Sequence, residues 1–149
     1  MPSFSDLHPG QAFDGPSRTI TESLLTTMTS LGGYTHPLFT DHTYVESSSP
    51  FESPPAPGAL VLFILGGLAE SSPAFDHHTV ALLGFDEVRF LNPVTAGTTL
   101  RSSFEVLETH PSDRSPGGTV LWSWRAADQR GRMICDAKAR MLVRDADEV

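Results

Sequence analysis

The sequence predicts an α+β fold in which an antiparallel sheet wraps around a central apolar helix. The segment Ala59–Glu70 is apolar on nearly every face, as expected of a helix that has to be buried. The second half of the chain holds several segments rich in β-branched and aromatic residues, some of which alternate apolar and polar positions. Short turns separate these segments, and such turns join antiparallel strands.

Length and composition describe a globular chain with an acidic surface. We expect its 149 residues to form one domain over residues 1–149, because this length can bury a sizeable core. Hydrophobic residues make up 39% and charged residues 19% of the chain. The 10 Lys and Arg against 18 Asp and Glu give a net charge of −8. Such a surface disfavours binding to nucleic acid or to anionic membranes.

Three further features indicate a cytoplasmic protein without a membrane anchor. Met1–Leu7 has no basic region followed by an apolar core, so we expect no signal peptide. The apolar run Ala59–Ala69 is shorter than the roughly 20 residues that a helix needs to cross a bilayer. The single cysteine, Cys135, lies in an alternating apolar pattern, and we expect a buried structural thiol in a reducing compartment.

The first half of the chain is predicted to hold one amphipathic helix. Turn signals at Pro9–Gly10 and Gly15–Pro16 precede it. Thr21 is a favoured N-cap residue, and helical spacing of apolar side chains follows at Leu24, Leu25 and Met28. The pair Gly32–Gly33 predicts the end of the helix.

The remaining elements are predicted from composition and turns. Residues 46–58 are so rich in proline and serine that we expect a loop without regular structure before the apolar helix. The predicted strands beyond that helix are Val80–Leu83, Val88–Leu91, Thr98–Leu107, Val120–Ala127 and Met133–Val143. Turns are predicted at Asn92–Pro93, Ala96–Gly97, Ser115–Gly118 and Gln129–Gly131.

Several motifs together resemble one enzyme family over nearly the whole chain. They are Arg18–Glu22, Pro57–Leu60, Leu83–Val94, Ala96–Leu100 and the turn Gln129–Gly131. This pattern is similar to the MaoC-like branch of the hotdog-fold superfamily, which includes (R)-specific enoyl-CoA hydratases and acyl dehydratases. The resemblance implies a hotdog fold. It also implies an acyl thioester as substrate, carried on CoA or acyl carrier protein, and no metal or redox cofactor.

The loop Gly33–Asp41 departs from the pattern of that family. Typical members read Gly-Asp-x-Asn-Pro-x-His-x-Asp, in which the first Asp and the His are catalytic. In this sequence Tyr34 stands at the position of that Asp, His36 at the Asn and Phe39 at the His. The resemblance therefore implies the fold more directly than it implies the hydratase mechanism.

Water addition to an enoyl thioester requires a base for the water and an acid for the carbon. A phenyl ring can be neither, while a phenol is a poor base at neutral pH but can donate a proton or a hydrogen bond. An imidazole titrates near neutral pH. Tyr34 and His36 are therefore candidate catalytic residues. Alternatively, His36 supports the loop by hydrogen bonding while Tyr34 and Phe39 pack against an acyl chain.

Other residues complete the candidate site. By the resemblance, Gly58 lies where the central helix begins, so nearby amides and the helix dipole are expected to stabilise a thioester oxyanion. Phe39, Pro57 and Asp41 are candidate pocket residues, although Asp41 is also a favoured N-cap for a short helix beginning at His42. The run Asp76-His77-His78 is expected to be a solvated loop, because a third ligand at useful spacing is missing and adjacent histidines point apart.

The leading interpretation is an enzyme that hydrates an enoyl thioester or dehydrates a 3-hydroxyacyl thioester, working as a homodimer. The alternative is a non-catalytic hotdog subunit that binds an acyl thioester or completes the active site of a homologous partner chain. Thioester hydrolysis is disfavoured, because the central helix offers no dedicated nucleophile and Glu70 lies too late in it.

Overall fold

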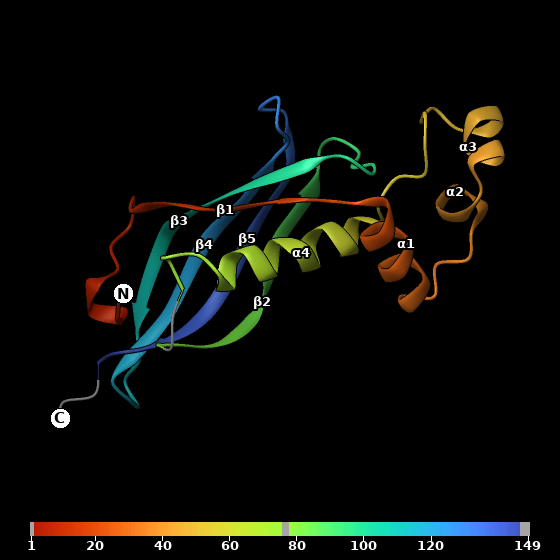
Figure 1. Ribbon diagram of the computed structural model, residues 1–149. Helices are drawn as coiled ribbons and strands as arrows, with labels where there is room; N and C mark the ends of the chain where they lie inside the picture. Colours follow the sequence, from red (N-terminus) through yellow and green to blue (C-terminus); the bar gives the residue numbers. More distant parts are fainter. Residues whose placement is uncertain (1, 76–77, 147–149) are drawn as a thin grey trace.

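The computed structural model describes residues 2–75 and 78–146, and the predicted α+β architecture is confirmed. Five strands form one sheet in the order β1-β3-β4-β5-β2, and every neighbouring pair is antiparallel. The strands are β1 (Ala12–Thr19), β2 (Thr79–Phe90), β3 (Thr99–Pro111), β4 (Gly117–Ala127) and β5 (Met133–Arg144). Figure 1 shows this sheet curving along the helix α4 (Gly58–Glu70), with the short 3₁₀ helix η1 (Phe4–Asp6) and the last residues of β5 at the end away from the start of α4.

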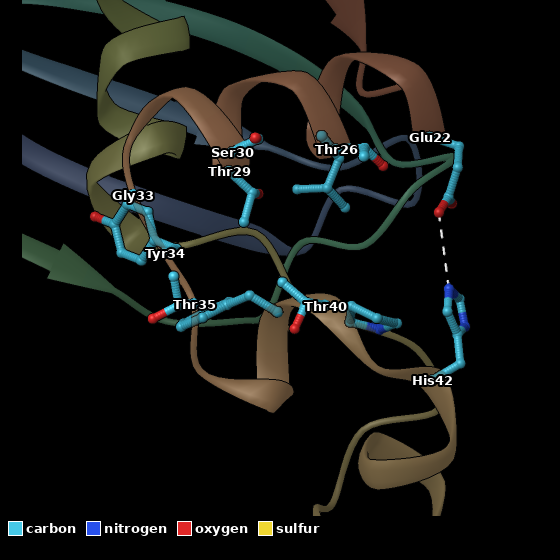
Figure 2. A pocket seen from close by; sticks show the side chains of 12 residues that line it. Glu22, Thr26, Thr29, Ser30, Gly33, Tyr34, Thr35, Thr40 and His42 are labelled. Carbon is cyan, nitrogen blue, oxygen red and sulfur yellow. Dashed lines mark ion pairs between the residues drawn. The ribbon is translucent and has the colours of Figure 1, made fainter.

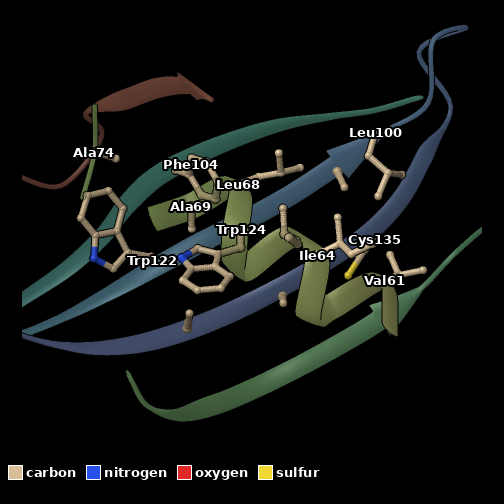
Figure 3. Close-up of a cluster of buried hydrophobic side chains, with 14 of the residues drawn as sticks. Val61, Ile64, Leu68, Ala69, Ala74, Leu100, Phe104, Trp122, Trp124 and Cys135 are labelled. Carbon is tan, nitrogen blue, oxygen red and sulfur yellow. The ribbon is translucent and has the colours of Figure 1, made fainter. Parts of the chain in front are cut away.

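The core lies between α4 and the concave face of the sheet. The buried side of the helix is made of Leu60, Val61, Ile64, Leu65, Leu68 and Ala69. These side chains share one hydrophobic cluster with Trp122, Trp124 and Phe104 (Figure 3). Cys135 belongs to the same cluster, which confirms the expected buried thiol, and burial raises its pKa to about 11.

The expectation that α4 is buried on every side was wrong for the isolated chain. Phe63 is 71% exposed, and Gly67 and Glu70 lie on the same uncovered face. The sheet of one chain is large enough to cover only one side of α4. Its own sheet therefore does not explain why the opposite side, which carries Phe63, is also apolar.

Strand β1 was not predicted, because its Gly15–Pro16 pair was interpreted as a turn. The pair instead lies at an irregularity in the edge strand, where the register with β3 shifts between Asp14 and Ser17. Proline, which lacks an amide donor, is tolerated at edges and bulges. The Ser102 hydroxyl donates to the Pro16 carbonyl across 2.8 Å, which satisfies one group at the irregularity.

The two strands predicted at 80–83 and 88–91 are one irregular strand, β2. Its register with β5 shifts at three places, including one between Leu82 and Gly84. These bulges explain why the period of two is interrupted in the sequence. As the other edge of the sheet, β2 exposes Val80 and Leu83 by 49% and 53%.

Three α-helices lie between β1 and α4 in the chain and project beyond the end of the sheet where α4 begins (Figure 1). They are α1 (Glu22–Leu31), α2 (Pro37–Thr40) and α3 (His42–Ser48). The predicted N-cap of α1 is confirmed, since the Thr21 hydroxyl accepts from the Leu24 amide over 3.1 Å. Gly33 follows the helix with φ +72°, as its predicted end requires. Because α3 continues to Ser48, the predicted loop over 46–58 is wrong at its start.

The hairpin between β4 and β5 is organised by a buried carboxylate. Asp128 accepts from the Arg130 and Arg132 amides and from the Arg132 side chain, at 2.9, 2.9 and 2.8 Å. Burial by itself would raise the pKa of Asp128, but these donors outweigh it and hold the pKa below the ordinary value of 3.8.

Candidate active site

The side chain of His36 caps the short helix α2. Its Nδ1 accepts the Leu38 amide over 3.1 Å, and the ring meets that of Tyr44 edge to face at 5.7 Å. With Nδ1 accepting, the neutral ring carries its proton on Nε2. His36 is exposed, so the structure gives it the supporting role considered above, and its catalytic role stays a prediction.

Tyr34 and Phe39 pack against each other inside the loop. Their ring centroids are 5.3 Å apart and the planes meet at 74°. The Tyr34 ring also covers Gly32, where a Cβ would lie 2.9 Å from two ring carbons. The two aromatic side chains, which the resemblance aligns with the family's acid and base, therefore form a packed pair.

Asp41 is the N-cap of α3, as its position before His42 predicted. Its Oδ1 accepts the Tyr44 amide over 3.0 Å. Two cavities lie beside the loop, one at the start of α4 and one between α1 and the α2–α3 segment. Among the described residues, Phe39 lines both cavities, whereas Asp41 and His36 line neither. The role of Asp41 as a pocket residue therefore stays a prediction.

The first cavity lies at the start of α4 and has a volume of about 370 Å³. Its lining is largely apolar and includes Phe39, Pro57, Gly58, Phe90, Val94 and Ile134. The Ala56 amide donates to the Val94 carbonyl over 2.6 Å, which holds the chain before the helix against the β2–β3 connection. The structure thus brings together three of the predicted site residues, Phe39, Pro57 and Gly58.

Gly58 is the first residue of α4, and its surroundings leave no space for a side chain. A Cβ there would come within 2.7 Å of the Phe90 ring. Within residues 2–75 and 78–146, neither the Gly58 amide nor the Ala59 amide finds a hydrogen-bond acceptor. Both amides are free at the positive end of the helix dipole, and Gly58 lines the apolar cavity.

A second cavity, of about 490 Å³, lies between α1 and the segment that holds α2 and α3. Figure 2 shows Thr26, Thr29 and Ser30 on one wall and Thr35 and Thr40 on the other. Glu22 and His42 face each other at one end, with Oε1 and Nε2 3.8 Å apart. The Tyr34 ring stands at the other end, and its hydroxyl points away from the threonines.

Sequence reasoning missed this second cavity and its pair of titratable residues. From sequence alone, Glu22 is named only as part of the family-like segment Arg18–Glu22, and His42 only as the start of a short helix. Twenty positions separate them in the chain, and no local pattern signals that the two helices meet.

Neither metal binding nor membrane insertion gains support from the described part of the chain. No group of three His, Cys, Asp or Glu side chains there is placed to hold a metal ion. Asp76 and His77 lie outside the described residues. None of the described helices is both long and apolar enough to cross a membrane.

Comparison with known structures reveals close similarity in fold. The X-ray structure of a monoamine oxidase regulatory protein from Archaeoglobus fulgidus is 31% identical, with a TM-score of 0.86 over 97% of this chain and 95% of that one. An (R)-hydratase from Pseudomonas aeruginosa is 24% identical, with a TM-score of 0.77 over 97% and 86%. A Mycobacterium tuberculosis protein with a double hotdog fold is 23% identical, with a TM-score of 0.84 over 99% and 46%.

Sequence comparison identifies the family as well. No curated protein matches the sequence significantly. Residues 5–122, however, match the model of the MaoC like domain. This match covers most of the chain and includes the loop, the start of α4 and strands β1 to β3. Together with the similarity in fold, it shows that the chain belongs to the MaoC-like family of hotdog-fold proteins.

Proposed function

We propose that the protein is a hydratase or dehydratase acting on an enoyl or 3-hydroxyacyl thioester carried by CoA or acyl carrier protein. The observation that carries this proposal is the free Gly58 amide at the start of α4, open to a largely apolar cavity. Membership of the MaoC-like family supports the same reaction class. In this proposal the chain is one domain and needs no metal or redox cofactor.

The Gly58 amide would donate a hydrogen bond to the thioester carbonyl oxygen. Charge grows on that oxygen as the enolate forms, so a donor fixed at a helix N-terminus stabilises the transition state more than the substrate. Phe90 and Val94 present apolar side chains beside this amide, and a less polar environment strengthens the hydrogen bond. Neighbouring apolar residues such as Phe39 and Ile134 offer contact to the acyl chain.

The acid and base of the reaction would come from the loop. Water has to lose a proton as its oxygen bonds to the β-carbon, and the α-carbon has to gain one. We assign proton donation to Tyr34 and proton abstraction to His36. His36 can act as a base only when its ring releases the Leu38 amide, because Nδ1 accepts that bond while Nε2 carries the proton.

The test uses crotonyl-CoA and longer enoyl-CoA substrates, with the absorbance of the conjugated enoyl group as readout and free thiol as a check for hydrolysis. The key variant is His36→Asn, because asparagine also caps a helix and so keeps the loop while removing the imidazole. We expect His36→Asn to abolish hydration and Tyr34→Phe to weaken it at least tenfold. Full activity of His36→Asn would refute the role of the imidazole.

A second candidate function is a subunit that binds the thioester but relies on a partner for acid and base. The packed Tyr34–Phe39 pair and the capping role of His36 favour it, since each side chain already has a structural task. Inactivity of the purified chain, restored by a homologous chain with the full Asp and His motif, would support this function. Activity of the chain alone would exclude it.

Both functions involve a second hotdog chain, either an identical copy or a homologue. The uncovered face of α4 carries Phe63, and the free edge strand β2 carries Val80 and Leu83. The unpaired backbone groups and apolar side chains of an exposed edge strand can pair with a strand of another chain. In the double hotdog fold from Mycobacterium tuberculosis, this chain corresponds to about half of the protein, which supports such a pairing.

A further inference from the structure

The segment 35–55 holds α2 and α3 and is tied to the body of the chain at its two ends. At one end the Tyr34 amide donates to the Thr29 carbonyl over 3.1 Å, and at the other the Ala56 amide donates to the Val94 carbonyl over 2.6 Å. Between these ties, the hydrogen bonds that residues 35–55 make with other described residues all close within the segment. The two helices can therefore move as one unit without breaking any of these bonds.

The apolar packing of this segment is separate from the main core. Val45 is fully buried, yet it lies outside the hydrophobic cluster that joins α4 to the sheet. The cavity of about 490 Å³ separates α1 from the segment, with Thr26 and Ser30 on one wall and Thr40 on the other (Figure 2). A segment with few buried apolar contacts to the rest of a protein opens locally at low cost in free energy.

An ion pair joins the two walls at one end of the cavity. His42 begins α3, and its Nε2 lies 3.8 Å from Oε1 of Glu22 at the start of α1 (Figure 2). This distance is too long for a hydrogen bond, so the attraction depends on the charge of the imidazole. Imidazoles change charge within the range of about pH 5 to 8, whereas carboxylates stay ionised throughout it.

The other ionisable groups around His42 do not compete with Glu22 across the cavity. The described lining contains neither lysine nor arginine, α2 has no ionisable side chain, and Tyr34 stands at the far end. Asp41 and Glu46 are carboxylates of the same segment as His42. Because they move together with the imidazole, their charges act on it in the same way whether the segment lies close to α1 or away from it.

We propose that the segment 35–55 is a lid over this cavity and that protonated His42 holds the lid closed by attracting Glu22. As pH rises and the imidazole loses its charge, this attraction is lost and the lid opens more often. Phe39 is carried on α2 and lines both cavities, so the position of the lid also shapes the cavity at Gly58. The inference concerns access to the site and does not depend on which reaction takes place there.

The experiment measures the distance between α1 and α3 with spin labels attached to Thr27→Cys and Ser47→Cys, two exposed positions. Cys135 is buried, with its pKa raised to about 11, so it stays unlabelled. From about pH 5.5 to about pH 8.5 we expect a population at longer distance to grow. The ratio of closed to open lid should fall by up to about fivefold, as for an exposed ion pair, and about 1 M salt should remove this response to pH.

Three variants in the labelled chain test the ion pair. Glu22→Gln removes the charge of the carboxylate and should show the distribution of the high-pH state at both pH values. His42→Lys keeps a positive charge and should show the distribution of the low-pH state at both. Glu46→Gln is the matched control, because it removes an exposed carboxylate that moves with the lid, and its response to pH should remain. Distances that do not change with pH in the wild type, or that still change in Glu22→Gln, would overturn the proposal.

Discussion

Replacement of Gly58 by alanine tests whether the thioester carbonyl lies against the start of α4. An added Cβ would approach Phe90 Cε2 to 2.7 Å, Cδ2 to 2.8 Å and Cζ to 3.1 Å. Atoms do not remain at such distances, so the Phe90 ring has to move by several tenths of an ångström. The ring lines the same cavity as Gly58, and its movement together with the new methyl group narrows the space for the carbonyl.

The expected loss of stability in Gly58→Ala is small, because two effects oppose each other. Overpacking costs about 1–3 kcal/mol in a closed core, and Phe90 is 47% exposed, so its ring can yield at about the lower end. Alanine in place of glycine in a helix contributes about 0.5–1 kcal/mol. The net change is about 1 kcal/mol or less, a shift of roughly 2–4 °C in the thermal midpoint for a chain of this size.

The expected loss of activity is much larger. Displacement of a substrate oxygen from an oxyanion donor costs roughly 10²–10³ in rate. We therefore expect kcat/KM for crotonyl-CoA to fall about 100-fold in Gly58→Ala, equal to about 2.7 kcal/mol. The double variant Gly58→Ala/Phe90→Leu makes room for the methyl group, so part of the activity should return.

A control separates helix propensity from the contact with Phe90. A Cβ at Gly67 would meet nothing within 4 Å, so Gly67→Ala reports the gain in stability from propensity alone, about 0.5–1 kcal/mol by urea unfolding. Unchanged kcat/KM in Gly58→Ala, with the fold intact, would show that the carbonyl binds elsewhere and would refute the role of Gly58.

Three further predictions concern assembly, pH and the thiol. Phe63→Ser and Leu83→Lys place polar groups on the uncovered faces of α4 and β2, and each should lower the molar mass measured by light scattering towards that of one chain. Because the pKa of Asp128 is lowered by folding, its contribution to stability is present above the ordinary value of 3.8 and lost as pH falls through the lower folded value. The thermal midpoint of Asp128→Asn should therefore lie below that of the wild type at pH 7, and the two should converge in acid. Cys135 is buried with its pKa raised to about 11, so a thiol reagent should label it in urea but not in the native protein at pH 7.

The features predicted correctly from sequence are those that depend on neighbours in the chain. Thr21 and Asp41 cap helices through amides three positions ahead, and Gly33 ends α1 through its own backbone angle. The strands β3, β4 and β5 were predicted because their apolar residues alternate and clear turns separate them. Such caps, turns and alternating patterns can be predicted without knowing which distant segments pack together.

The features that sequence reasoning missed depend on segments far apart in the chain. Gly15–Pro16 has the composition of a turn, and only pairing with β3 turns it into a bulged edge strand. The apolar pattern of α4 predicted burial correctly on one side, but no local pattern says whether the other side is covered by the same chain. The Glu22–His42 pair exists because α1 and α3 meet in space. In each case the deciding partner lies many residues away.

The departures of the loop from the family pattern are linked by packing. The Tyr34 ring lies beside Gly32 and against Phe39, so an aspartate at 34 would remove the ring contact of Phe39. Asparagine, the family's usual residue at 36, is a favoured N-cap, and His36 performs that same task through Nδ1. Tyr34 and His36 thus both take part in the packing and hydrogen bonding of the loop. In the proposed function, the chain keeps the helix N-terminus at Gly58, whose free amide would bind the thioester carbonyl whatever proton donor the loop supplies.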